Sequence, residues 1–245
     1  MTKVNITHIL NVFFDEISDQ SGKMLENFRY NDRAFARALL ANQTEVRSKD
    51  AIQSGVALKA TPISLEVHPF VFRLVCQNGT ILGKSTQSHK LGQVGDSCQV
   101  SVSGKAGEVI ASTEIEAWFR DAVRDCCRPE AFYDSAQKFH HSLHHVLTNQ
   151  VGVDKALLAS LNQKSFPLYK VWHEKIMREY LQRDDPTMFR LINAVTAVAR
   201  DLHDPQQKWK LECFAGELAM TTFASPAKKV AAQKALPAER STVQI

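Results

Sequence analysis

A change of hydrophobic period near residue 113 constrains the fold more than any other feature of the chain. Before it, between Ile52 and Ser103, β-branched runs are separated by Gly, Pro, Asn and Ser, a pattern typical of strands joined by turns. From Thr113 almost to the end of the chain, apolar residues recur at helical spacing instead. The sequence therefore predicts an α+β fold, in which a small antiparallel sheet is followed by a helical half.

The segment before the sheet is expected to be helical. Apolar residues recur at helical spacing from Ile6 to Ile17, and Asn5 is a good N-cap for that helix. A second, shorter helix is predicted over residues 32–40. We expect one α+β domain over residues 1–224, strand-rich over 45–112 and helical over 113–224, followed by a basic, Ala-rich tail over 225–245.

Aspartate followed by proline marks the start of two helices in the second half. Asp185-Pro186 and Asp204-Pro205 each have the form of an N-cap residue with proline at the first helical position. The helix after Asp185 is predicted to bury these apolar residues: Met188, Leu191, Ile192, Val195, Val198 and Leu202.

Composition excludes several classes of protein. The 245 residues are 44% hydrophobic and 23% charged, which is typical of a globular protein rather than a disordered or fibrous one. The formal net charge of +4 is too small to indicate nucleic-acid binding by itself. No apolar run reaches the roughly 18 residues that a membrane span needs, and the N-terminus lacks a signal-peptide pattern, so we expect no membrane contact.

The cysteines point to a reducing compartment. There are five of them, an odd number with no paired spacing, so reduced thiols and a cytoplasmic location are expected. Cys126 and Cys127 are neighbours on a predicted helix, where adjacent side chains point about 100° apart. We therefore expect at most one of them to be buried.

The stretch 77–86, QNGTILGKST, differs from the phosphate-loop pattern G-x-x-x-x-G-K-[ST] at one position. Asn78 replaces the first glycine, and the side chains of residues 80–82 would crowd a bound phosphate. A phosphate loop also needs a helix that begins at Lys84, where the sequence shows no apolar periodicity. The pattern favours a hairpin, and a divergent phosphate loop stays open as an alternative.

Asn78 and Gly79 predict a two-residue turn between two apolar runs, because both residues tolerate the positive φ of a type I′ turn. In that register Arg73 lies opposite Lys84, and like charges directly opposite each other destabilise a hairpin. An early end of the pairing, a carboxylate such as Glu66, or a bound anion would each relieve this repulsion.

A histidine-rich stretch, FHHSLHHV over residues 139–146, contains two i,i+4 pairs, His140 with His144 and His141 with His145. The predicted buried stripe of this helix leaves all four histidines on its flank or its outer side. Neither pair has the Glu that a zincin helix carries directly after its first His. We expect surface histidines, no metal site and no cofactor.

Two segments together resemble domain of unknown function 932, a family of phage- and plasmid-associated bacterial proteins. The first, SGVALKATPISLEVHPFVFRLVCQNGTI, is similar to that family's strand followed by an Arg, a Cys and an Asn-Gly turn. The second, NAVTAVARDLHDPQQKWKLECFAGELA, is similar to its C-terminal helix pair, with Asn193, Thr196 and Gly216 at the recurring positions. Together they bracket residues 54–219. The resemblance implies a mobile-element context and a fold, without catalytic residues, and the order of elements is also similar to that of phage single-strand annealing proteins.

These observations favour a non-enzymatic nucleic-acid-binding accessory protein of a phage or plasmid that binds single-stranded DNA in preference and forms a homo-oligomer. The candidate phosphate contacts are Arg73, Lys84, His89 and Lys90, together with the basic tail. Two alternatives stay open. One is an enzyme that acts on nucleotides or nucleic-acid ends through a divergent phosphate loop at 77–86, and the other is a partner-binding protein without nucleic-acid contact.

Overall fold

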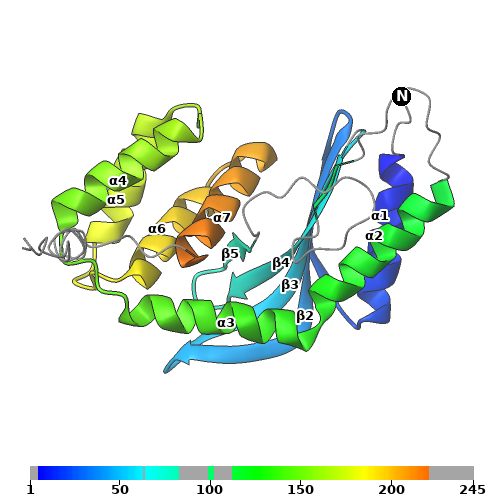
Figure 1. The fold of residues 1–245 in the computed structure, drawn as a ribbon, viewed down its shortest axis with the longest axis horizontal. Helices are drawn as coiled ribbons and strands as arrows, with labels where there is room; N and C mark the ends of the chain where they lie inside the picture. The colour runs from blue at the N-terminus through cyan, green and yellow to red at the C-terminus, as the bar shows by residue number, and fades with distance from the viewer. Residues whose placement is uncertain (1–4, 63, 83–98, 102–111, 221–245) are drawn as a thin grey trace, which may run out of the picture.

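The structure is a computed structural model that describes residues 5–62, 64–82, 99–101 and 112–220 (Figure 1). It confirms the predicted α+β fold, because an N-terminal helix is followed by an antiparallel sheet and then by helices. The elements are α1 (Ile6–Asp19), β1 (Lys23–Tyr30), β2 (Arg33–Arg47), β3 (Asp50–Thr61), β4 (Ser64–Arg73), β5 (Asn78–Ile81), β6 (Gln99–Ser101), α2 (Ser112–Cys127), α3 (Pro129–His144), α4 (Gln150–Gln163), α5 (Tyr169–Leu181), α6 (Met188–Arg200) and α7 (Pro205–Met220).

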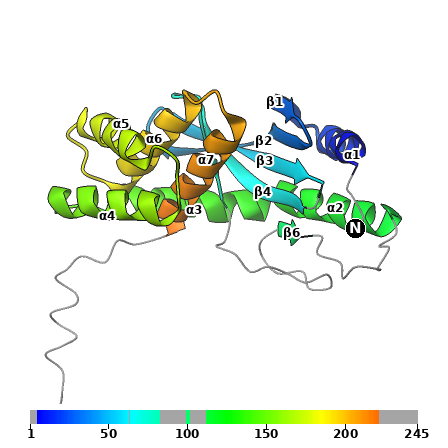
Figure 2. The same cartoon turned by 90° about the horizontal axis from the view of Figure 1, so that it is seen from above.

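The sheet follows the order β1-β2-β3-β4-β5, and β6 pairs with β4 beside β5. Two-residue turns join the first three strands, since Tyr30 pairs with Arg33 and Arg47 pairs with Asp50. Alternate side chains of a strand point to opposite faces, so each strand contributes to both faces of the sheet. We call these the α1/α2 face and the α7 face, after the helices that cover them (Figure 2).

Small side chains on the α1/α2 face let two helices pack closely against the sheet. Ala34, Ala36 and Ala38 of β2 are fully buried beneath them. The apolar stripe of α1, which includes the fully buried Phe13, supplies the bulk that these alanines lack. Asn5 caps α1 as predicted, since its side chain accepts a hydrogen bond from the backbone N–H of His8 (3.1 Å).

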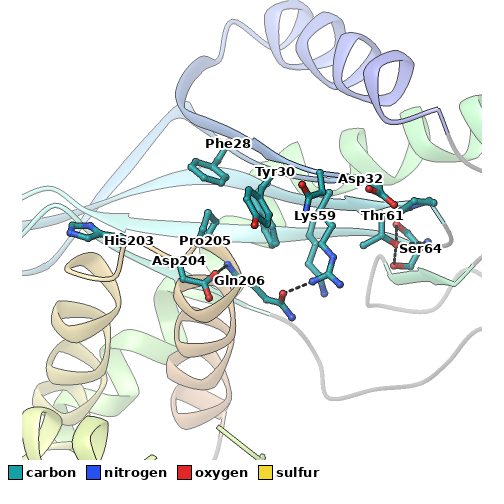
Figure 3. A pocket seen from close by; sticks show the side chains of 14 residues that line it. Phe28, Tyr30, Asp32, Lys59, Thr61, Ser64, His203, Asp204, Pro205 and Gln206 are labelled. Atoms are coloured by element: carbon teal, nitrogen blue, oxygen red, sulfur yellow. Dashed lines mark hydrogen bonds between the residues drawn. The ribbon is translucent and has the colours of Figure 1, made fainter. Parts of the chain in front are cut away.

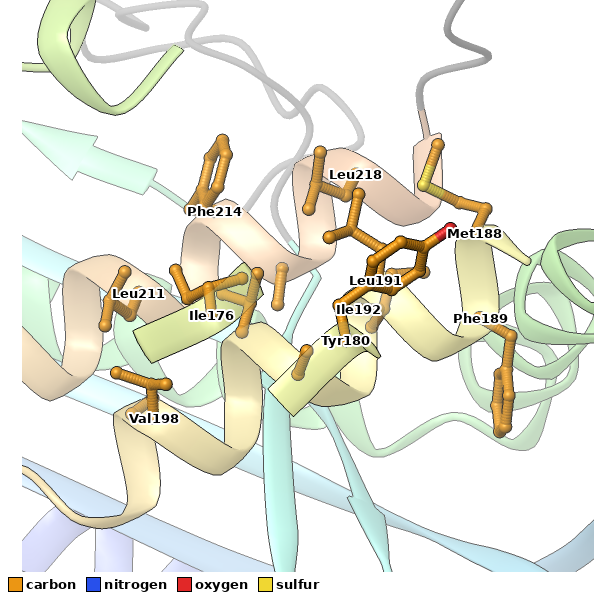
Figure 4. Close-up of a cluster of buried hydrophobic side chains, with 14 of the residues drawn as sticks. Ile176, Tyr180, Met188, Phe189, Leu191, Ile192, Val198, Leu211, Phe214 and Leu218 are labelled. Carbon is orange, nitrogen blue, oxygen red and sulfur yellow. The ribbon is translucent and has the colours of Figure 1, made fainter. Parts of the chain in front are cut away.

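Helix α6 is the central element of the helical half, where it packs on α5 and α7 (Figure 4). The predicted stripe is confirmed, with five of its six residues buried and Leu202 half-buried against the same core. Its N-cap is Thr187 rather than the predicted Asp185. The prediction for α7 holds, because Pro205 is its first residue and the Asp204 carboxylate accepts from the backbone N–H of Gln206 (2.8 Å).

The predicted second helix over residues 32–40 is wrong, because Asp32 lies in the turn after β1 and residues 33–40 belong to the strand β2. The strand-rich part of the chain accordingly begins at Lys23 rather than at residue 45. The segment contains good helix formers, but its side chains alternate with period two: the alanines face α1 and α2, while Phe35, Arg37 and Leu39 face α7. Pairing with β1 and β3 overrides the local helix propensity.

The predicted turn at Asn78-Gly79 is also wrong. The turn comprises residues 74–77, Gln77 has a φ of 52°, and Asn78 and Gly79 begin β5. Arg73 therefore lies opposite Asn78 and not opposite Lys84. Gly79 is needed for packing rather than for a turn, because a Cβ at this position would lie 2.3 Å from the ring of Phe70.

Both Cys126 and Cys127 are buried, against the expectation that at most one would be. They lie at the end of α2, in the core that this helix shares with α1 and the sheet. Burial raises the pKa of Cys127 to about 12, so this thiol is protonated at neutral pH. Among the helices of the described residues, none is long and apolar enough to cross a membrane.

Candidate functional site

Arg73 is a structural residue in this fold. Its guanidinium donates from Nε and Nη2 to the two carboxylate oxygens of Asp50, and each of these distances is 2.5 Å. Nη1 donates to Oδ1 of Asn193 (3.1 Å). Only 9% of the residue is exposed. Burial acts to lower the pKa of Arg73, but the hydrogen bonds and charge of Asp50 raise it above its ordinary value. The other predicted phosphate contacts, Lys84, His89 and Lys90, lie outside the described residues.

The described part of the phosphate-loop motif is a strand. Residues 78–81 pair with β4 and are buried, so their backbone is not wrapped around an anion. The carbonyl of Cys76 and the side chain of Asn78 accept hydrogen bonds from the guanidinium of Arg200, over 3.0 and 3.5 Å. This segment holds α6 against the sheet. Lys84, where a phosphate loop would need a helix to begin, lies outside the described residues.

The four histidines lie at the C-terminal end of α3, where His140, His141 and His144 are exposed and His145 is half-exposed. Nε2 of His140 lies 3.2 Å from the carbonyl oxygen of Glu45 on β2. Within the part of the chain that the structure describes, no three His, Cys, Asp or Glu side chains are grouped as metal ligands.

An open groove of about 1000 Å³ lies on the α7 face, because α7 covers only part of that face (Figure 3). We call it the aromatic groove. The sheet lines it with Phe28, Tyr30, Arg33, Phe35 and Lys59, and the start of α7 lines it with Asp204, Pro205 and Gln206.

Two exposed aromatic side chains stand on the floor of this groove. Phe28 is 43% exposed and Tyr30 is 63% exposed. Both lie on β1, two residues apart and therefore on the same face of the sheet. Phe35, which pairs with Phe28, is buried and packs on Trp209 of α7 with 6.0 Å between the ring centroids. The aromatic residues of the groove thus range from the exposed Phe28 and Tyr30 on β1 to the buried Phe35 on β2.

Two cations stand beside these rings. Arg33 pairs with Tyr30 across the hairpin, is exposed, and donates from Nη1 to Oε1 of Gln206. Lys59 is more enclosed and its Nζ lies 2.5 Å from Oε1 of Glu66. Burial acts to raise the pKa of Glu66, but His68 and Lys59 hold it below its ordinary value. Glu66 is therefore ionised at neutral pH and fixes Lys59 in place.

The groove as a whole is nearly neutral. Asp32 and Asp204 balance Arg33 and Lys59 among its lining residues. Asp204 directs its carboxylate at the first backbone N–H groups of α7, so that helix end is already capped by an anion. A phosphate at the N-terminus of α7 would compete with this carboxylate.

A buried ion network fixes the inner wall of the groove. Arg37 of β2 donates to Glu212 of α7, with 2.5 Å between Nη2 and Oε2, and also to Glu26 of β1. Nζ of Lys208 lies 2.9 Å from the same Glu26 carboxylate. Burial raises the pKa of Glu212 to about 6, although Arg37 acts to lower it. The network ties the strands that carry the aromatic residues to α7.

Sequence reasoning missed Phe28, Tyr30 and Arg33 because it assigned residues 32–40 to a helix and left 23–30 without an element. The signal that could have found them is the stretch NFRYND, in which polar and apolar residues alternate over 27–30 and Asn-Asp follows as a turn pair. Asn31 has a φ of 51°, the left-handed conformation that Asn tolerates in tight turns.

Comparison with known proteins adds no further information on the groove. No family model, no curated protein and no solved structure matches the chain. The resemblance to domain of unknown function 932 therefore stays a prediction, and the groove is interpreted from its own residues.

Proposed function

We propose that the protein is a non-enzymatic accessory protein that binds single-stranded nucleic acid, with single-stranded DNA as the expected ligand, in the aromatic groove. The observation that carries this proposal is the pair of exposed rings, Phe28 and Tyr30, beside the exposed cation Arg33. A phage or plasmid context is supported by the family resemblance alone.

The chemistry of the groove fits unpaired bases. An exposed aromatic ring gives a base a face on which to stack, worth about 1–3 kcal/mol for each base, and a nearby Arg contacts the phosphate or stacks as well. Successive β1 side chains on one face lie about 6.6 Å apart, within reach of two neighbouring bases of an extended strand. A duplex keeps its bases stacked inside and cannot use the rings in this way.

The charges of the groove predict a weak dependence of binding on salt. The arginine and lysine side chains among the described residues that line it are Arg33 and Lys59, and Lys59 is already paired with Glu66. Each phosphate contact on a single strand contributes a slope of about −0.7 to the plot of log affinity against log salt. We expect a slope of about −0.7 to −1.4 from the groove itself. This slope is much shallower than that of a protein that binds through a basic surface.

The test is the affinity of Tyr30→Ala for a fluorescent oligothymidylate. We expect the affinity to fall about 5- to 150-fold, the equivalent of one lost stacking contact. Tyr133→Ala is the matched control, because Tyr133 is 52% exposed on α3 and outside the groove. Arg33→Gln should flatten the salt slope by about 0.7 without lowering the melting temperature, since Arg33 is exposed.

Two results would contradict the proposal. One is the absence of oligothymidylate binding to the wild-type protein at low salt. The other is an equal affinity of Tyr30→Ala, Tyr133→Ala and the wild-type protein, which would place any binding elsewhere on the chain.

A further inference from the structure

β1 is an edge strand. It pairs with β2 on one side, and no strand of the described residues pairs with its other side (Figure 2). Its eight residues are all exposed except Glu26, which is half-buried. Every second backbone N–H and C=O group along this edge is consequently unpaired, which makes the strand a template for another strand.

The side chains of β1 are unusual for a solvated edge. Four of its eight residues, Met24, Leu25, Phe28 and Tyr30, are large exposed hydrophobic residues. Edge strands usually carry a Pro, a central Lys or a bulge, and these features prevent them from pairing with another strand. β1 has a bulge only between Met24 and Glu26, and its pairing with β2 is regular from Glu26 to Tyr30.

We propose that two copies of the chain pair antiparallel through β1, with Phe28 of one copy opposite Phe28 of the second. The contact is isologous, so a single two-fold axis closes it as a dimer. The proposal stands apart from nucleic-acid binding, because it follows from the free edge and from the side chains of β1.

The polar side chains of β1 favour this register. With Phe28 on the axis, Asn27 lies opposite Arg29 and Glu26 lies opposite Tyr30, so no like charges face each other and each polar pair can hydrogen-bond. A shift of the pairing by two residues, which keeps each side chain on its face of the sheet, sets Arg29 against Arg29. The opposite shift sets the Glu26 carboxylate against Phe28. Both alternatives are less favourable.

The dimer would join the two aromatic grooves, which is a consequence that rests on the proposed function. Phe28 and Tyr30 lie on the α7 face of each copy, and the proposed register keeps the α7 faces of both copies on the same side. Four aromatic rings would then follow each other across the interface.

The test is the mass of the purified full-length chain, without nucleic acid, by sedimentation equilibrium over a range of concentrations. We expect a dimer. Asn27→Lys should weaken it at least tenfold, because the new cation faces Arg29 twice in the dimer. Asn27 is exposed on the face of β1 opposite to the groove residues, so this variant leaves Phe28 and Tyr30 untouched.

The second variant tests the register itself. Asn27→Lys combined with Arg29→Glu should restore the dimer, since each new cation then faces a new carboxylate. In the two shifted registers the double variant would set either the new carboxylates at position 29 or the new cations at position 27 against each other, and it would dissociate. Asn27→Asp should tighten the dimer, and Val151→Lys is the control, because Val151 is 64% exposed on α4.

The outcomes are distinct from those of the binding assay. A monomer at all concentrations or a dimer that Asn27→Lys leaves unchanged would overturn the proposed β1 pairing, and a double variant that does not recover would overturn the register with Phe28 on the axis. If the chain is dimeric as described but binds no oligothymidylate, this inference stands and the proposed function fails.

Discussion

Asp50 is a buried carboxylate that two arginines neutralise. It is 3% exposed and accepts hydrogen bonds from Arg73 and from Nε of Arg47, the latter over 3.0 Å. The ring of Phe189 lies under both guanidinium groups. Its centroid is 5.3 Å from Cζ of Arg73 and 5.4 Å from Cζ of Arg47. Asp50 therefore joins the tip of the β2–β3 hairpin to β4, above the start of α6.

Replacing this carboxylate is expected to destabilise the fold strongly. Asp50→Asn leaves the buried Arg73 guanidinium without its counter-charge, and breaking a buried pair in this way costs about 3–5 kcal/mol. Urea denaturation measures the change in the free energy of unfolding. Asp184→Asn is the control, because Asp184 is exposed and its variant should stay within about 0.5 kcal/mol of the wild-type protein. Equal effects of the two substitutions would show that the Asp50–Arg73 pair contributes little.

At the scale of elements, α7 is the helix that connects the sheet with the helical core. Trp209 packs on the α7 face of the sheet, while Leu211, Phe214 and Leu218 pack into the core around α6. The helix approaches the sheet closely at Gly216. A Cβ at this position would lie 2.0 Å from the carbonyl oxygen of Ile81 on β5.

Gly216→Ala is expected to destabilise the protein by about 1–3 kcal/mol, because the added methyl group meets backbone that cannot move aside. The substitution would otherwise favour the helix by up to about 1 kcal/mol. Gly152→Ala is a matched control in α4, since its Cβ would meet only the side chain of Asn149. The melting temperatures of the two variants give the comparison. A Gly216→Ala variant as stable as Gly152→Ala would contradict the close approach of α7 and β5.

The elements differ in how far the sequence predicts them. The helices α1 and α6 follow from the sequence, because the large apolar residues of each recur at helical spacing over several turns. β1 and β2 do not, since their pairing partners lie on neighbouring strands and the first, Ala-rich part of β2 also fits a helix. The turn at residues 74–77 escaped prediction for a related reason, because Gly79 is required by the ring of Phe70, which no local pattern reveals. The aromatic groove could not be predicted without β1.

At the scale of the whole molecule, buried carboxylates tie together segments that are far apart in the chain. Glu16 of α1 is 1% exposed and accepts hydrogen bonds from Arg120 (2.7 Å) and Arg124 (2.8 Å) of α2. Burial acts to raise the pKa of Glu16, but these two arginines hold it below its ordinary value of 4.5. At three further carboxyls, Glu26, Asp50 and Glu66, burial also acts to raise the pKa. Basic partners hold the pKa below its ordinary value, namely arginine and lysine at Glu26, arginine at Asp50, and His68 and Lys59 at Glu66.

The sign of the pH dependence follows from these shifts. A carboxyl whose pKa is lower in the folded state binds a proton more readily in the unfolded state, so its stabilising contribution is present above the unfolded pKa and is lost as the pH falls. Glu212 has the opposite sign, because its pKa is raised to about 6 in the folded state. Its ionisation costs stability as the pH rises from 4.5 to about 6. We therefore expect the whole fold to lose stability steeply below pH 4.5, where the contributions of Glu16, Glu26, Asp50 and Glu66 are lost together.

Glu16→Gln tests this account of acid unfolding. At pH 7 the variant is expected to be less stable than the wild-type protein, because Arg120 and Arg124 lose the charge that they share. Below pH 4.5 the difference should narrow, since the wild-type Glu16 then becomes protonated as well and its contribution disappears. The measurement is the free energy of unfolding in urea at pH values from 7 to 3. Glu174→Gln is the control, because Glu174 is exposed on α5 and its curve should run parallel to that of the wild-type protein. A gap between Glu16→Gln and the wild-type protein that stays constant from pH 7 to 3 would mean that the arginines of α2 hold α1 by packing rather than by charge.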